Sequence, residues 1–220
     1  MVSMFSLMGL YAGGKVLAPA VVPVIPVEQE EVNPWYIGIG LIPYAEYKSY
    51  CERGVSYDDV TYGAMVRGGY DINQYFGLEA RIMGTFWGKG PNGGERFAHY
   101  GLYAKPMYPV SERINVYGLA GYGYTESINS GGNGNLPEID DWGFSWGIGL
   151  EFDLSDRKDD FMEKVAYDRE FDGYADQEKG WGLFIDYQRL WDDHSFVNQK
   201  LNKSGTVDLD VISVGITYDF

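Results

Sequence analysis

Apolar and polar residues alternate along most of the chain after residue 34. In the clearest stretch, residues 141–154, every second residue is large and apolar, and most of the residues between them are glycine, serine or acidic. A period of two predicts a β-strand with two different faces. The final residues repeat the pattern. The apolar faces of these two segments consist of Trp142, Phe144, Trp146, Ile148, Leu150 and Phe152, and of Ile212, Val214, Ile216, Tyr218 and Phe220.

Eight segments of this kind follow one another. No helical pattern of any length lies between them, which disfavours a parallel sheet with crossover helices. Glycines at 118, 121 and 123 blur the alternation in the fifth segment, so its facing stays open. The predicted strands cover residues 35–46, 59–71, 75–88, 96–108, 113–126, 141–154, 180–192 and 206–220.

The unbroken apolar face of residues 141–154 is as long as a membrane-spanning strand, about ten residues. After the first dozen residues the chain has no apolar run of about 18 residues, so no transmembrane helix is predicted. An even number of antiparallel strands can close on itself and leave no edge in lipid. The predicted fold is therefore all-β, an eight-stranded antiparallel up-and-down transmembrane β-barrel. Aromatic residues are expected at its two membrane interfaces, with Trp35, Tyr108, Trp181 and Tyr218 at one and Trp142, Trp191 and Tyr124 at the other.

The net charge of −15 disfavours nucleic acid and anionic lipid as binding partners. Nucleic acid requires clustered lysine and arginine, which the chain lacks. The chain also offers no polybasic patch for anionic lipid. Cys51 is the only cysteine, so no disulfide can form within the chain.

The first 34 residues differ from the rest. Residues 1–12 are predicted to be a shortened signal peptide, with a short apolar core and a cleavage position after Ala12. Residues 13–34 contain four prolines and an acidic patch, which predicts an extended linker on the periplasmic side. The barrel is expected to occupy residues 35–220.

Strand parity places a balanced set of charges inside the predicted barrel. An eight-stranded barrel has just enough interior space for side chains, and buried charges must be paired. The favoured interpretation is a network of ion pairs that closes the lumen, and a narrow ion path is the alternative. A wide diffusion pore is excluded by the number of strands. The predicted lumen residues are Arg67, Glu79, Arg81, His99, Lys105, Glu151 and Asp186.

Two segments carry a resemblance to a known family. Residues 116–124, Val-Tyr-Gly-Leu-Ala-Gly-Tyr-Gly-Tyr, and the ending Gly-Ile-Thr-Tyr-Asp-Phe at 215–220 resemble the OmpA-like and opacity-protein-like small outer-membrane barrels. This resemblance covers about residues 35–220 and implies an outer-membrane location in a Gram-negative cell envelope. It also implies that the barrel-assembly machinery reads the terminal Phe220 and that both termini face the periplasm.

With that orientation, residues 155–179 form a long periplasmic insertion where such barrels normally have a short turn. Residues 168–179 match the start of an EF-hand-like calcium loop, with acids at positions 1, 3, 5 and 9 and glycine at position 6. Position 12 is Lys179 rather than glutamate, so the match is incomplete. The candidate calcium ligands are Asp168, Glu170, Asp172 and Asp176. An acidic solvated loop and a docking segment for a periplasmic partner are the other interpretations.

Two more segments are candidates for chemistry. Asp192, Asp193, His194 and Ser195 fall at the predicted extracellular rim, where Asp192 and His194 could converge as an acid–base pair. The glycine-rich segment 127–141 lacks the strand-to-helix setting of a phosphate loop and is predicted to be a surface loop. No enzyme activity is predicted. The chain is expected to be a structural or surface-interacting barrel with a closed lumen; a barrel that acts through residues 155–179 is the alternative, and a rim hydrolase is disfavoured.

Overall fold

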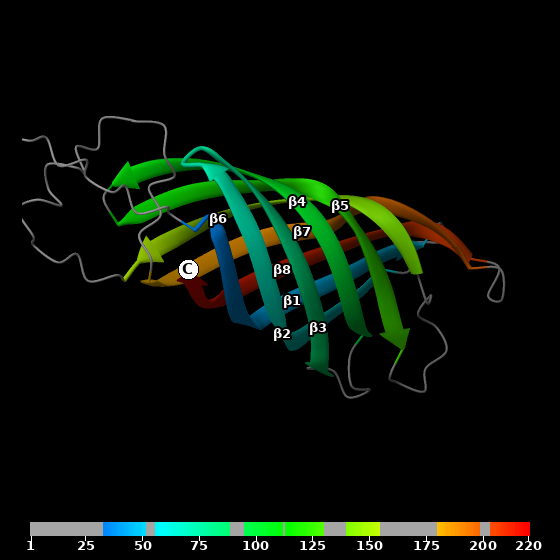
Figure 1. Cartoon of the computed structure of the whole chain (residues 1–220). Helices are drawn as coiled ribbons and strands as arrows, with labels where there is room; N and C mark the ends of the chain where they lie inside the picture. Colours follow the sequence, from blue (N-terminus) through cyan, green and yellow to red (C-terminus); the bar gives the residue numbers. More distant parts are fainter. Residues whose placement is uncertain are drawn as a thin grey trace, which may run out of the picture. The chain divides into compact units, whose positions relative to one another are not determined.

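A computed structural model of the chain describes residues 33–51, 56–88, 95–111, 113–129, 140–154, 180–198 and 203–220. These residues form eight strands, each antiparallel to its neighbours, and β8 pairs with β1 to close a barrel (Figure 1). No helix among them is long and apolar enough to cross a membrane. The predicted fold is confirmed. The strands are β1 (Trp35–Cys51), β2 (Ser56–Asn73), β3 (Phe76–Gly88), β4 (Glu95–Ser111), β5 (Ile114–Asn129), β6 (Asp140–Asp153), β7 (Gly180–Asn198) and β8 (Lys203–Asp219).

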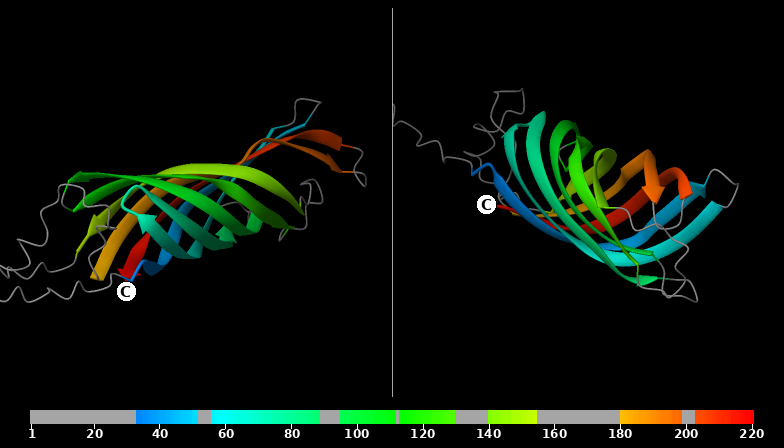
Figure 2. Two further views of the ribbon diagram at one scale, coloured as in Figure 1. Left: turned by 45° about the horizontal axis from the view of Figure 1, so that its top comes forward. Right: turned by 90° about the vertical axis from the view of Figure 1, so that its right-hand side faces the viewer.

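The barrel has two different ends. The near end holds the start of β1 and the end of β8, and the far end lies opposite. Four strands extend further at the far end than predicted, so residues 47–51, 56–58, 193–198 and 203–205, which lie outside the predicted strands, are strand. These extensions pair in the order β7, β8, β1, β2 and project beyond the other strands (Figure 2). We call residues 190–198, 203–210, 45–51 and 56–60 the protruding sheet.

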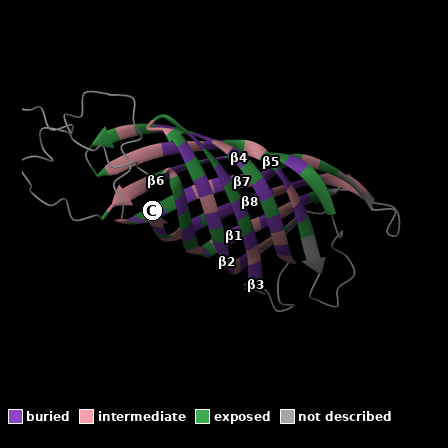
Figure 3. Ribbon diagram, viewed as in Figure 1, coloured by how far each residue is buried: buried purple, intermediate pink, exposed green. Residues whose placement is uncertain are grey.

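Residues along each strand alternate between the barrel's outside and its interior (Figure 3). The outer positions are apolar, and Leu102 and Ile148 are 69% and 56% exposed. Aromatic pairs border this apolar belt at the near end, where the ring centroids of Trp181 and Tyr218 lie 5.0 Å apart. A belt of this kind, bordered by aromatic residues, is the surface that lipid requires.

One predicted belt residue is placed wrongly by the sequence pattern. Trp191 is only 1% exposed and lies inside the barrel, next to the equally buried Leu190. The register of β7 against β8 shifts on both sides of Trp191, and Asp193 beyond it has a positive φ of 48°. These shifts reverse the alternation, as a β-bulge does, so counting every second residue gives the wrong face.

A similar shift in β1 reverses the facing of that strand. The register changes between Ile42 and Ala45 against β2, with Pro43 between them. Tyr36 and Ile42 point inward before the shift, and Ala45 and Tyr47 point inward after it. Proline cannot donate a hydrogen bond to a ladder, so a bulge is one of the few places in a sheet that accept it.

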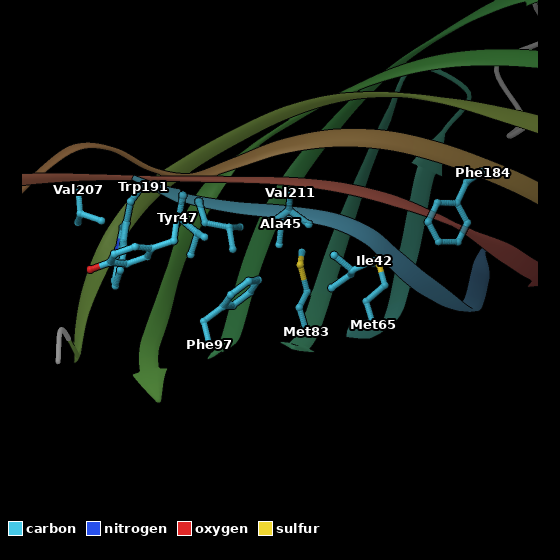
Figure 4. Packing of buried hydrophobic residues seen from close by; sticks show 12 residues of the cluster. Ile42, Ala45, Tyr47, Met65, Met83, Phe97, Phe184, Trp191, Val207 and Val211 are labelled. Carbon is cyan, nitrogen blue, oxygen red and sulfur yellow. The ribbon is translucent and has the colours of Figure 1, made fainter. Parts of the chain in front are cut away.

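The interior divides into two parts. Apolar side chains fill the part toward the far end, in a cluster that runs from Phe184 to Trp191 and Val207 (Figure 4). Buried charged side chains gather toward the near end, where they share the interior with a second apolar cluster, Tyr103, Met107, Tyr117 and Leu119. In β5, whose facing was left open, Tyr117 and Leu119 point inward.

Glycine makes room for this filling. A Cβ added at Gly149 would lie 2.4 Å from Cζ of Tyr117. A Cβ at Gly215 would lie 2.2 Å from the backbone oxygen of Ile39. Any larger residue at these two positions would force the tyrosine ring or the neighbouring strand to move.

Candidate functional site

The charged part of the interior is centred on Glu79 of β3. Its carboxylate accepts hydrogen bonds from the Tyr36 hydroxyl of β1 and from Nε of Arg81, and Arg67 NH1 lies 3.6 Å away. Glu79 and both arginines are fully enclosed, with side-chain exposures of 0%. Each charge therefore has an opposite charge beside it, which is the condition for ionised groups to be stable inside a protein.

Arg67 and Lys105 connect this centre to β6. Arg67 NH2 donates to Glu151 Oε1 at 2.6 Å, and Lys105 Nζ lies 3.3 Å from Glu151 Oε2. The guanidinium of Arg67 also lies 3.8 Å from the centroid of the Phe184 ring, at the boundary with the apolar part. These bonds span the barrel from β2 and β4 to β6.

A second set of bonds connects the centre to β7. Arg81 NH2 donates to Asp186 Oδ2 at 2.8 Å, and the Tyr117 hydroxyl donates to the same oxygen at 2.7 Å. The Ser213 hydroxyl of β8 donates to the other oxygen of Asp186. All eight strands thus contribute side chains to one continuous set of ion pairs and hydrogen bonds, which we call the lumen cluster.

The structure places all seven predicted lumen residues inside the barrel and brings six of them into the lumen cluster. His99 is the exception, because its partners are hydroxyl groups. Its Nδ1 lies 2.7 Å from Thr125 Oγ1, and its Nε2 lies 2.6 Å from the Tyr103 hydroxyl. An imidazole between two hydroxyls is fully hydrogen-bonded.

The sequence analysis missed several members of the lumen cluster. Asp71 has the same parity as Arg67 and lies 3.8 Å from Lys105 Nζ. Tyr36 and Tyr117 supply hydroxyl groups from β1 and β5. Parity alone could have found Asp71 and Tyr36. Tyr117 could not be assigned, because the facing of its strand was open.

The acid–base pair predicted between Asp192 and His194 at the extracellular rim is not formed. Asp192 Oδ1 accepts from Arg189 NH1 at 2.8 Å, whereas His194 Nε2 lies 3.2 Å from Asp141 Oδ2 of β6. The expected convergence of Asp192 with His194 is therefore wrong, because the bulge at Asp193 changes the alternation between them. Ser195 is exposed on the same strand.

Other predictions fall on residues that the structure does not describe. The candidate calcium ligands and the whole insertion at 155–179 lie outside the described residues, as do the signal peptide and most of the proline-rich linker. The same holds for residues 130–139 of the glycine-rich segment. Among the described residues, no group of three or more histidine, cysteine or carboxylate side chains could hold a metal ion.

Residues 15–220 match the family model of the outer membrane protein beta-barrel domain. The chain belongs to this family. It is also 33% identical over 70 residues to Outer membrane protein X of Escherichia coli strain K12; the match covers 32% of this chain and 37% of that protein. The chain thus matches well under half the length of that relative. Family members are outer-membrane barrel proteins, and the chain is accordingly located in the outer membrane.

One solved structure of similar architecture supports the fold alone. AlkL, an outer membrane protein solved in lipid bilayers, aligns with 89% of this chain and 94% of its own, with a TM-score of 0.50 and 14% identity. The Ail protein of Yersinia pestis aligns with 84% of this chain and 98% of its own, with a TM-score of 0.49 and 16% identity.

Proposed function

We propose that this protein is a closed, non-conducting barrel that acts at the cell surface through its protruding sheet. The observation that carries the proposal is the filling of the interior. The lumen cluster occupies the near half, where Arg67 and Arg81 have 0% exposed side chains, and packed apolar residues occupy the far half. A hydrated ion moving along the axis would first have to displace both parts.

The protruding sheet is the part available to a partner. The family's orientation, with both termini in the periplasm, directs the far end toward the outside of the cell. The exposed charges at this end are mainly acidic, and Asp58, Asp192 and Asp193 belong to the sheet itself. An acidic surface attracts cationic partners and repels polyanions. The proposed role is binding, and His194 at this end pairs with the carboxylate of Asp141, 3.2 Å from its Nε2.

The closed lumen predicts leak-level current. Purified protein inserted into a planar bilayer is expected to give no discrete conductance steps, since ions have no continuous water-filled path. The measurement is single-channel recording over several hundred insertions, with a known wide porin as the positive control. Regular steps that scale with salt concentration would contradict the proposal. Their loss in Arg67→Met would identify the lumen cluster as the ion path.

The proposed orientation predicts which end reacts with an external reagent. A cysteine introduced at the exposed Asp193, in a Cys51→Ala background, is expected to react with a membrane-impermeant maleimide on intact cells. The matched control is a cysteine at the exposed Tyr75, in the short turn between β2 and β3 at the near end. It should react only after the outer membrane is permeabilised. The reverse pattern would place the protruding sheet in the periplasm and remove the surface role.

A further inference from the structure

The ends of three strands form a separate sheet at the far end of the barrel. Backbone pairing between β3 and β4 ends at Gly84↔Ala98, and pairing between β6 and β7 ends at Trp146↔Arg189. Beyond these points, β5 remains paired with β4 on one side and with β6 on the other. We call residues 95–98, 122–129 and 140–145 the short sheet.

Side chains of two different kinds bridge the seams on either side of the short sheet. On the β3 side, the backbone N–H of Phe97 donates to the Thr85 hydroxyl at 2.9 Å. On the β7 side, Asp141 Oδ2 lies 3.2 Å from His194 Nε2. A hydroxyl keeps its proton at any physiological pH, whereas the charge of an imidazole changes between pH 5 and pH 8. Of these two bridges, the one between Asp141 and His194 can therefore respond to pH.

A bulge in β7 directs His194 toward β6. The register against β8 shifts on both sides of Trp191, and the backbone N–H of Asp193, which has a positive φ, donates to Asp208 Oδ1 at 2.7 Å. The His194 ring stacks on the indole of Trp191 with a centroid distance of 5.3 Å and an interplanar angle of 11°. The imidazole is thus held in place against a buried ring, within reach of Asp141.

Carboxylates dominate the charged groups around His194. The cation of this region, Arg189, is already bonded to Asp192 and to Asp210. A protonated imidazole is attracted by the carboxylates and donates a charge-assisted hydrogen bond from Nε2. A neutral ring lacks that attraction and can donate from Nε2 in only one tautomer. The carboxylates on the strands packed here are Asp140 and Asp141 of β6, Asp192 and Asp193 of β7, and Asp208 of β8.

The bridge closes the corner of the barrel where the inner face of the protruding sheet is apolar. Trp191 pairs with Leu209 across β7 and β8, and His194 pairs with Val207. Leu209 and Val207 are both 0% exposed. A Cβ added at Gly143 of the short sheet would lie 2.9 Å from Cδ1 of Trp191, so the indole also contacts the short sheet. Parting of the two sheets would uncover apolar surface, which is typical of binding sites for partners.

We propose that His194 and Asp141 form a pH-dependent fastener between the short sheet and the protruding sheet. In acid, the protonated ring holds the edge of β6 against β7. The contribution of the ion pair is fully present while His194 is charged and is lost as the pH rises, so the sheets part at this corner near neutral pH. The inference rests on the proposed function, since the far end must face outward for external pH to regulate what a partner at the cell surface can reach.

Electron–electron double resonance measures the distance between the two sheets. Spin labels are attached at Glu126→Cys in the short sheet and at Asp58→Cys in the protruding sheet, both exposed positions, in a Cys51→Ala background. The purified full chain is placed in lipid nanodiscs at pH 5 and at pH 8. The distribution should be narrow at pH 5 and gain a longer component at pH 8. The ratio of the two components should change by up to about fivefold, the factor that a partly exposed ion pair supplies.

Three further variants assign the pH response to the fastener. His194→Gln and Asp141→Asn should each give the pH 8 distribution at both pH values. The matched control is Asp140→Asn, which removes the neighbouring carboxylate and should keep the response of the parent.

The signal of 5-fluorotryptophan at position 191 reports protonation directly, because the imidazole stacks on this indole. The signal is assigned by its loss in Trp191→Phe. It should move between pH 5 and pH 8 in the parent and stay in place in His194→Gln.

Three outcomes would overturn the proposal. Equal distance distributions at both pH values in the parent, with a moving Trp191 signal, would mean that protonation does not hold the sheets together. A pH response that persists in His194→Gln would assign it to other groups. Loss of the response in Asp140→Asn would mean that any carboxylate at this rim suffices. The proposed closed lumen and orientation would survive all three, because conductance and labelling on cells test them separately.

Discussion

Replacing Glu79 by alanine is expected to lower the free energy of unfolding by about 3–5 kcal/mol. Glu79 accepts from Tyr36 and Arg81 and lies 3.6 Å from Arg67, all in the closed interior. Its removal leaves two buried guanidinium groups with fewer partners and one hydroxyl without its acceptor. Breaking a buried pair from one side costs more than the pair itself contributes, because the remaining charge cannot reach water.

Urea titration in lipid vesicles measures this loss, followed by the shift between folded and unfolded forms on an unheated gel. Glu126→Ala is the matched control, because Glu126 is an exposed carboxylate at the far end of β5. It should change the free energy of unfolding by at most about 0.5 kcal/mol. Equal small effects of both substitutions would show that water reaches the lumen cluster and that the interior is not closed.

Replacing Ile148 by arginine is expected to cost about 2–4 kcal/mol of folding stability in the membrane. Ile148 is 56% exposed near the middle of the outward face of β6, between Trp146 and Leu150. In a bilayer, that exposed fraction meets hydrocarbon rather than water. The guanidinium would have to bend toward an interface or draw water into the membrane.

Folding yield and stability to urea in lipid vesicles measure the effect of Ile148→Arg. Asp140→Arg is the control, since it places the same side chain beyond the aromatic border on the same strand. Its effect should be below about 1 kcal/mol. A tolerated arginine at position 148 and a costly one at position 140 would contradict the assignment of the belt to lipid.

The sequence predicts whether a side chain points into the barrel or out of it wherever the alternation along the strand is unbroken. In β6, Ile148 and Glu151 were assigned correctly because no bulge interrupts the strand. At Trp191 the same rule failed, since two register shifts in β7 lie on either side of it. A single strand carries no signal for a bulge, which depends on how the neighbouring strand pairs. Proline within a strand is the visible sign of an interrupted ladder, and a register shift lies at Pro43 in β1 and at Pro109 in β4.

The lengths of the strands and the partners inside the barrel were harder to predict. Asp58 and Asp208 lie in the protruding sheet, where no lipid imposes an apolar face, so these strand ends resemble loops in composition. The bond from Arg67 to Glu151 joins residues 84 positions apart in the sequence. Parity assigned both residues to the interior, but the pairing between them depends on how the closed barrel curves.

The seam between β1 and β8 joins the first strand to the last, from Tyr36↔Asp219 to Cys51↔Gly205. One edge of β1 therefore has no partner until nearly the whole chain has been synthesised. Until then, that edge can pair with another polypeptide, which is the usual route to aggregation. The barrel consequently requires a period of protected transit, and its closure must be a late event whose rate depends on delivery of the full-length chain rather than on elongation.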